Sequence, residues 1–201
     1  MGLSQTSAPS VEPLSLAAAK AHLRVTTSDE NDLIQGLITV ARRYCEEVTG
    51  RQFITATWQY LFEDFPSGNE FAVPWPPLQS VTSITYLDED GASQTLSTDV
   101  YGLDTSPSPG RIYLKYNQSW PSYRSQRGGI VVRYVAGYGD AASDVPEPIV
   151  HAIKLHLGFE YAQRLPVAPA TVGNVVTQHI PDRVWSLLAP YRMIDVSTNV
   201  F

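Results

Sequence analysis

The spacing of apolar residues changes twice along this chain of 201 residues, and these two changes limit the folds that it can adopt. From Leu16 to Val48, apolar residues recur every three or four positions, which is typical of amphipathic helices. From Thr55 to Tyr138 they alternate with polar residues, which is typical of strands with one buried face. The helical spacing returns after Pro146. The sequence therefore predicts an α+β fold in which an antiparallel β region is inserted into a helical core.

Three helices make up the predicted core. The first is LAAAKAHLRV, which Ser15 can cap. The second is expected to be capped by Ser28, has acidic residues in its first turn and ends at Gly50. The loop between these two helices is short, so they are expected to pair as an αα-hairpin. The third helix is EPIVHAIKLHLGFEYAQR, with prolines at its start, where a missing amide donor costs little.

The middle region contains seven short segments with the composition and alternation of strands. Clusters of Pro, Gly, Asp and Ser separate them, and this density of strands indicates a small antiparallel barrel or sandwich. The seven segments are 55–65, 69–73, 80–87, 93–96, 100–104, 111–116 and 130–135. DEDG at 88–91 predicts a hairpin turn in which Gly91 adopts positive φ, and SWPSYRSQRGG at 119–129 predicts a loop.

These elements divide the chain into four predicted parts. They are a flexible N-terminus at 1–13, a helical core at 14–54 and 139–164, a β insertion at 55–138, and a linker with an extended C-terminal arm at 165–201. The linker is low in charge and rich in small residues. The arm contains PDRVWSLLAPYR, which predicts a short amphipathic helix, and it closes on MIDVSTNVF as an extended tail.

The bulk composition excludes several classes of protein. The formal net charge of −6 and a pI of about 5.1 argue against a DNA-gripping surface, which needs clustered Lys and Arg. A single cysteine excludes an internal disulfide framework and suits a reducing compartment. The first residues lack the basic start and apolar run of a signal peptide. No apolar stretch approaches the roughly 18 residues of a membrane span.

The candidates for catalysis are weak. Cys45 falls on the apolar stripe of the second helix, whereas a nucleophilic cysteine needs a polar, partly exposed site. His151 and His156 are five residues apart, so they do not share a helix face as zinc-binding pairs do. His156 and Glu160 could share a ligand, but the sequence favours a solvated polar pair. VAGYGD at 135–140 lacks the third glycine and the lysine of a phosphate loop, so a strand-to-helix turn is predicted.

The remaining carboxylates lie in or near turns, where they serve solubility and turn geometry, although a glycosidase-like pair stays open. We therefore predict no catalytic, cofactor-binding or metal-binding residue. The segment PWPP contains a PxxP pattern that peptide-binding domains read, but a stiff sheet edge with Trp75 against the core is favoured. Arg124 and Arg127 lie in a solvated loop and are expected to meet a neighbour's carboxylates rather than nucleic acid. Trp75, Arg124 and Arg127 are thus predicted as contacts to another subunit or neck protein.

Several runs of the sequence resemble the head–tail connector (adaptor, or neck) proteins of long-tailed phages and of gene transfer agents, which are phage-like particles. The runs are LSLAAAKAHLRV, DENDLIQGLITVARRYCEEVTGRQFITATW, PPLQSVTSITYLDEDG, RIYLKYNQSWPS, VVRYVAGYGDAASDVPEPIVHAIKLHLGFEY and VWSLLAPYR. They cover about residues 14–192. The resemblance depends on their order and spacing rather than on one sharp motif.

The resemblance implies a structural protein, not an enzyme, with a helical core and a β insertion. It implies a dodecameric ring beneath the portal protein, followed by a stopper or tail protein, with DNA passing through and no membrane contact. The location implied is the neck of a virion or phage-like particle assembled in the bacterial cytoplasm. The residues implied for portal binding lie within 181–201, and they are Arg183, Trp185, Leu188, Tyr191, Arg192, Ile194 and Phe201.

Physical reasoning supports this interpretation at two points. A terminal arm with aromatic and aliphatic residues after a flexible linker is an exposed apolar surface unless it docks on a partner or folds back onto its own helices, and the linker favours docking. An acidic wall repels phosphate, which suits a DNA conduit. Two other classes stay open. They are another virion component, such as a tail-completion protein or a terminase small subunit, and an enzyme that uses Cys45 or the His/Glu cluster at 151–160.

Overall fold

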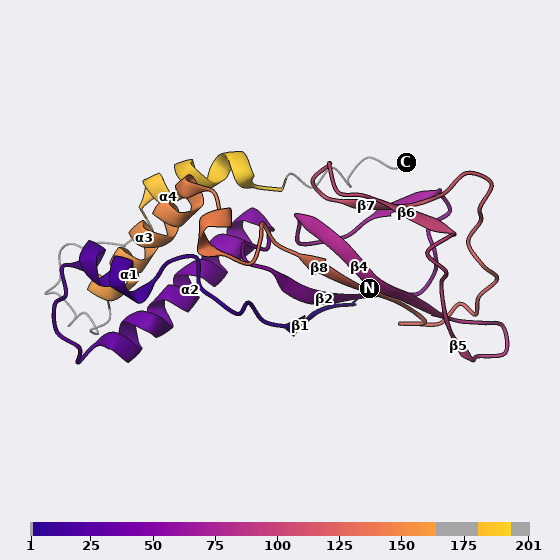
Figure 1. Ribbon diagram of the computed structural model, residues 1–201, viewed down its shortest axis with the longest axis horizontal. Helices are drawn as coiled ribbons and strands as arrows, with labels where there is room; N and C mark the ends of the chain where they lie inside the picture. The colour runs from indigo at the N-terminus through magenta and orange to yellow at the C-terminus, as the bar shows by residue number, and fades with distance from the viewer. Residues whose placement is uncertain (1, 164–180, 194–201) are drawn as a thin grey trace, which may run out of the picture. The chain divides into compact units, whose positions relative to one another are not determined.

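The computed structural model describes residues 2–163 and 181–193, which form two compact units. The β unit comprises Met1–Ser10 and Gly50–Asp140, and the helical unit comprises Val11–Thr49 and Ala141–Phe201. Neither unit is one continuous segment. Figure 1 shows the strands gathered in one unit and the helices in the other. The predicted α+β fold, with strands inserted between helical segments, is confirmed.

In the described part of the chain, the β unit contains eight strands in two antiparallel sheets. The strands are β1 (Gly2–Ser7), β2 (Ala56–Phe62), β3 (Glu70–Ala72), β4 (Leu78–Leu87), β5 (Ser93–Thr95), β6 (Tyr101–Asp104), β7 (Arg111–Leu114) and β8 (Ile130–Ala136). One sheet has the order β1-β2-β8-β4-β5 and the other β3-β7-β6. Each of the seven predicted segments overlaps one of β2–β8, and the predicted loop at 119–129 contains no strand.

The first strand, β1, corrects the prediction of a flexible N-terminus. Its backbone pairs with β2, from Gly2 opposite Leu61 to Ser7 opposite Thr57. All of its side chains except Gln5 are exposed. Backbone hydrogen bonds hold this edge strand in the sheet. It buries no alternating apolar face, so the spacing of its apolar residues could not predict it.

The two sheets share one hydrophobic core. Ile84, Ile130 and Val132 from the larger sheet are fully buried together with Ile112 from the smaller one. Tyr134 is also fully buried, and its hydroxyl donates a hydrogen bond to the Pro74 carbonyl at 2.8 Å. The hydroxyl of this large core residue is therefore satisfied, as a buried polar group must be.

The proline-rich segment at 74–77 connects β3 to β4 and is not itself a sheet edge, which corrects that part of the prediction. Trp75 has a positive φ of 56°, and its ring stacks on Trp58 with centroids 4.9 Å apart. The indole Nε1 of Trp58 donates to Oε1 of Gln52 at 3.1 Å. Trp75 thus packs against the core as predicted, because the stiff backbone on both sides of it holds the ring over β2.

The helical unit is built on α2 and α3. Its elements are α1 (Leu16–Leu23), α2 (Asn31–Thr49), a 3-10 turn η1 (Ala142–Asp144), α3 (Glu147–Ala162), α4 (Asp182–Leu188) and a 3-10 turn η2 (Ala189–Tyr191). The Ser15 hydroxyl accepts a hydrogen bond from the Ala18 amide at 3.2 Å, and Gly50 has a φ of 67° after the last residue of α2. These two predicted boundaries are therefore confirmed, whereas Ser28 does not cap α2, which begins three residues later at Asn31. Among the described helices, none is long and apolar enough to cross a membrane.

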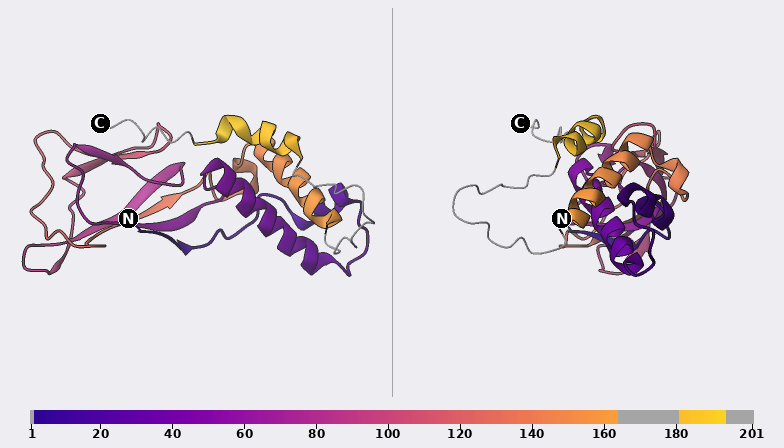
Figure 2. Two further views of the ribbon diagram at one scale, coloured as in Figure 1. Left: turned by 180° about the vertical axis from the view of Figure 1, so that it is seen from behind. Right: turned by 90° about the vertical axis from the view of Figure 1, so that its left-hand side faces the viewer.

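Helix α3 lies between α2 and α4 and contacts both. The two views in Figure 2 agree that α4 runs beside α3. The fully buried apolar side chains of these three helices are Ile34, Ile38, Ala41, Cys45, Ile149, Ala152, Ile153, Leu157, Val184 and Leu188. Their spacing of three and four residues is what places them on one face of each helix.

The helical unit also buries a charged cluster that the apolar pattern did not reveal. The guanidinium of Arg42 is 2.7 Å from Oε2 of Glu12 through Nε and 2.6 Å from Oε2 of Glu46 through Nη1. Arg42 is only 4% exposed and Glu46 is also buried. The cluster ties the segment before α1 to α2, so Glu12 is held in place although the sequence placed it in a flexible N-terminus.

Candidate assembly surfaces

The only thiol of the chain lies in the core of the helical unit. Cys45 is fully buried, and burial, with a smaller contribution from Glu46, raises its pKa to about 12. A thiol with this pKa stays protonated at neutral pH and is a poor nucleophile. Cys45 is therefore a packing residue, as its position on the apolar stripe predicted.

His156 is a core residue of α3, which corrects the interpretation of His156 and Glu160 as a solvated pair. Its ring is 2% exposed and lies on Tyr44, with centroids 4.2 Å apart. Nε2 is 3.6 Å from Oε1 of Glu160, and Nδ1 has no hydrogen-bond partner in the described part of the chain. Within that part there is also no group of three residues that could hold a metal ion.

We expect the helical unit to become less stable as the pH is lowered, because His156 is buried. Burial lowers its pKa below the usual 6.5, and Glu160 acts in the opposite direction. The unfolded chain then binds more protons than the folded chain, so this stability is complete above pH 6.5 and is lost as the pH falls through the folded-state pKa.

Urea unfolding of a His156→Phe variant between neutral and acidic pH checks this expectation. The variant should show a weaker dependence on pH than the wild type below pH 6.5. A His151→Phe variant, which changes an exposed histidine of the same helix, should keep the wild-type dependence. An identical slope for His156→Phe and the wild type would contradict the assignment.

The predicted C-terminal arm begins with a helix that packs within its own subunit. Val184 and Leu188, four residues apart on α4, are both fully buried. The picture of a detached arm is therefore wrong for α4, and Leu188 is a core residue with no surface to offer a partner. The physical reason is that an amphipathic helix buries its apolar face on the nearest apolar surface, which α3 provides.

The opposite face of α4 remains open. Trp185 is 41% exposed and meets Tyr44 edge-on, with ring centroids 6.2 Å apart. Arg183 and Arg192 are exposed, whereas Tyr191 is half-buried. The Met193 amide donates to the Thr49 carbonyl at 2.8 Å, which holds the end of this segment on the helical unit. Ile194, Phe201 and the linker at 165–180 lie outside the described residues.

The two predicted arginines lie in the loop before β8, and both are exposed. The Arg124 amide donates to the Leu87 carbonyl at 2.9 Å. Its guanidinium lies close to the β4–β5 turn, because a Cβ added to Gly91 would meet Nη1 at 3.0 Å. Neither Arg124 nor Arg127 forms an ion pair with any residue that the structure describes. Trp75, in contrast, is already engaged by Trp58.

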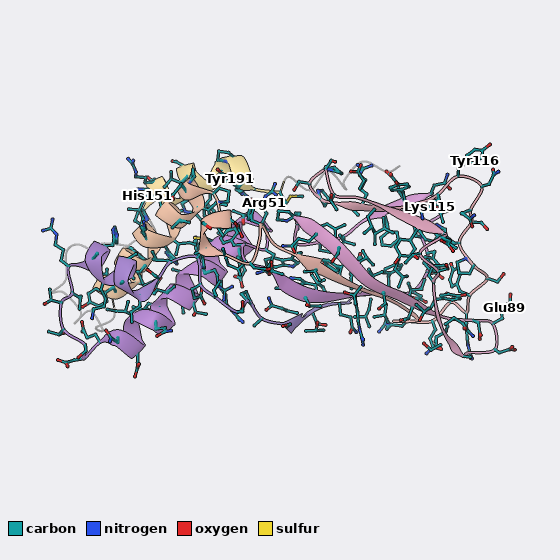
Figure 3. All side chains as sticks on the ribbon, in the orientation of Figure 1. Arg51, Glu89, Lys115, Tyr116, His151 and Tyr191 are labelled. Carbon is teal, nitrogen blue, oxygen red and sulfur yellow. The ribbon has the colours of Figure 1, made fainter. Side chains whose placement is uncertain are left out.

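Tyr116 is an exposed residue that the sequence reasoning missed. It is 91% exposed and occupies a turn closed by a 3.0 Å hydrogen bond from the Gln118 amide to the Lys115 carbonyl. Asn117, beside it, has a φ of 57°, and Lys115 Nζ donates to the Thr98 carbonyl at 2.8 Å. Figure 3 shows Tyr116, Lys115 and Glu89 at the same end of the β unit. The asparagine was the available signal, because Asn tolerates the left-handed conformation in such turns.

Solved structures with the same fold come from phage-like particles. A chain in the neck of an empty gene transfer agent particle, computed with C6 symmetry, is 22% identical, with a TM-score of 0.78. Chains from the virion of a native particle and from a native neck computed with C12 symmetry are each 20% identical, with TM-scores of 0.77 and 0.76. In all three cases the match covers 98% of this chain and 97% of the other.

Two further comparisons address the family. No curated protein matches the chain. The family model described as head completion protein matches residues 13–194, which is nearly the whole chain. The resemblance to neck proteins of phage-like particles is thus confirmed by a second route, and the chain belongs to the head completion protein family.

Proposed function

We propose that this chain is a structural adaptor that forms a dodecameric ring beneath the portal and joins the capsid to the tail of a phage-like particle. The observation that carries the proposal is the match of fold over nearly the whole chain to chains from gene transfer agent necks, one of them computed with C12 symmetry. Membership of the head completion protein family supports the same role. The role is structural, and assembly takes place in the bacterial cytoplasm.

The portal contact in this proposal is the open face of α4 together with the chain end. Arg183, Trp185 and Arg192 are all exposed and lie within ten positions of one another in sequence. Trp and Arg are the residue types that dominate binding energy at interfaces. Tyr191 contributes its exposed part, and Ile194 and Phe201 follow in the tail. Leu188 is excluded from this surface because its side chain is buried.

The other contacts of the proposal lie on the β unit. Arg124 and Arg127 carry charges that the described residues do not neutralise, so they suit carboxylates of a neighbouring copy. Tyr116, held outward by its turn, suits the stopper or tail protein that follows in the neck. Trp75 is half-buried against Trp58, and it is a candidate contact only through the part of its ring that stays exposed. DNA passes through the ring without specific binding, because a net charge of −6 repels phosphate.

Mixing the purified chain with its portal and imaging the product by negative-stain electron microscopy tests the proposal. We expect a ring of added density on one face of the portal. A portal without added density would contradict the role. A chain that ends after Met193 should still fold but should bind less tightly, because it lacks Ile194 and Phe201.

Replacing Trp185 with alanine is expected to weaken portal binding about 30-fold or more, which is the effect of losing a dominant interface residue of about 2 kcal/mol. Fold stability should change little, because the indole is half exposed. Tyr116→Ala is the matched control, since it removes an exposed aromatic ring from the β unit, and it should leave portal binding unchanged. Biolayer interferometry on immobilised portal measures both. Equal portal affinities for the two variants would show that Trp185 is not part of the portal contact.

A further inference from the structure

The outward face of α2 carries apolar residues where a solvated helix normally carries polar ones. Leu33 and Val40 are 41% and 50% exposed, and Ile34 and Ile38 are buried on the opposite face. Gly36 lies on the exposed face between Leu33 and Val40, because residues three and four apart are neighbours on a helix surface. We call Leu33, Gly36 and Val40 the α2 strip.

The strip has a gap at its centre and a projecting side chain beside the gap. A Cβ added to Gly36 would have no heavy atom within 4 Å, so the backbone is open there. Val40 stands one helical turn away with half of its surface in solvent. A second helix could therefore approach closely at Gly36, with a side chain of the size of valine filling the gap.

Charged residues flank the strip with opposite signs. Asp32 lies at its N-terminal end and Arg43 at its C-terminal end, and both are exposed. Neither forms an ion pair with a residue that the structure describes. The two are eleven positions apart, which is about 16 Å along a helix axis. If a second α2 lies antiparallel on the first, Asp32 of each copy meets Arg43 of the other.

We propose that the free chain forms a two-fold dimer through antiparallel packing of the α2 strips. Val40 of each copy fills the gap at Gly36 of the other, and two Asp32–Arg43 pairs close the ends. Glu47, further along the same face, lies beyond this overlap because the opposing helix begins at Asn31.

The dimer goes beyond the adaptor role and does not rest on it. Neighbours in a cyclic ring are related by a rotation about the ring axis and not by a two-fold axis, so the dimer belongs to the chain before it enters a ring. One helix pair buries less than the roughly 1,000 Å² of a stable interface, so the dimer is weak and can open during assembly.

Sedimentation equilibrium of the full chain over a wide concentration range tests the dimer. The wild type should show a reversible monomer–dimer equilibrium. Val40→Asp and Gly36→Leu should each stay monomeric, and both should keep the wild-type circular dichroism and thermal unfolding because the changed positions are exposed. Leu103→Asp is the matched control, since it places the same charge at an exposed leucine of β6, and it should dimerise like the wild type.

Exchange of the two charges tests the antiparallel register. Asp32→Arg alone and Arg43→Asp alone each place like charges together at both ends. An exposed ion pair changes an equilibrium constant by up to about fivefold, and symmetry applies each change twice, so the dissociation constant should rise about 10- to 25-fold at low salt. The double variant Asp32→Arg/Arg43→Asp should return to the wild-type value.

Three results would overturn the dimer. They are a wild type that is monomeric at the highest concentration, a wild type that forms only closed rings, and a double charge variant that is no tighter than the single ones. Each of these leaves the portal-binding experiment unaffected, so a failure of the dimer and a failure of the adaptor role are distinguishable.

Discussion

An Arg42→Ala variant is expected to lose about 3–5 kcal/mol of the free energy of unfolding of the helical unit, which is the usual effect of removing one partner of a buried ion pair. The guanidinium is 4% exposed and lies between the carboxylates of Glu12 and Glu46. Alanine would leave the buried Glu46 carboxylate without this counter-charge. It would also leave Glu12 held to α2, among the described residues, only by the hydrogen bond that the Thr39 hydroxyl donates to its Oε1 at 2.8 Å. Urea unfolding followed by circular dichroism at 222 nm measures the change.

Arg43→Ala is the matched control, because it removes the same side chain from the next position of α2, where it is exposed. A surface change of this kind usually shifts stability by no more than about 0.5 kcal/mol. An Arg42→Leu/Glu46→Leu variant should recover part of the loss, since it removes the buried carboxylate together with its partner. Equal destabilisation by Arg42→Ala and Arg43→Ala would show that the buried cluster contributes nothing beyond a surface arginine.

A Leu188→Ala variant is expected to destabilise the packing of α4 by about 2–5 kcal/mol, the range for removing a fully buried leucine side chain. Leu188 is fully buried, and α4 has only seven residues, so few other contacts can compensate. Hydrogen–deuterium exchange of the amides at 182–191 should become much faster in this variant. Portal binding should weaken as well, because Trp185 and Arg183 would lose their support.

Leu187→Ala provides the comparison within the same helix, because Leu187 is only half-buried. Its effect on exchange should be clearly smaller. Faster exchange to the same extent in both variants would mean that α4 is not anchored through Leu188. Normal exchange in Leu188→Ala would show that the helix is held by its ends alone, for example by the hydrogen bond between Met193 and Thr49.

The β unit shows how much of the fold can be predicted from the local pattern of apolar and polar residues. The seven segments with alternating residues all contain strands, and each segment contributes at least one buried side chain to the shared core. The turn at 88–91 was equally readable, since Gly91 has a φ of 84° and its amide donates to the Asp88 carbonyl at 3.0 Å. Strand β1, which was not predicted, is held by backbone hydrogen bonds to β2. Backbone hydrogen bonds require no particular sequence of side chains, so no pattern predicted this strand.

The candidate surfaces were harder to predict than the elements that carry them. The C-terminal residues were proposed for portal binding because of the resemblance to neck proteins. The sequence could not predict that Trp185 is exposed and Leu188 is buried. The structure buries one and exposes the other because α3 lies on one side of α4 only. Tyr116 carries no signal of its own. It becomes prominent only because its turn and the Lys115–Thr98 hydrogen bond hold it away from the core.

The sequence by itself determined the types and order of the four described helices and of strands β2–β8, and it placed the only thiol on a buried helix face. Hydrophobic period, caps and turn residues act over a few neighbouring positions, so they can be read from the chain alone. Only the tertiary structure decided that Arg42 and His156 are buried, that Leu188 belongs to the core and that the strip on α2 stays open. Burial of these groups depends on elements that are distant in sequence, and no local pattern records which of them meet.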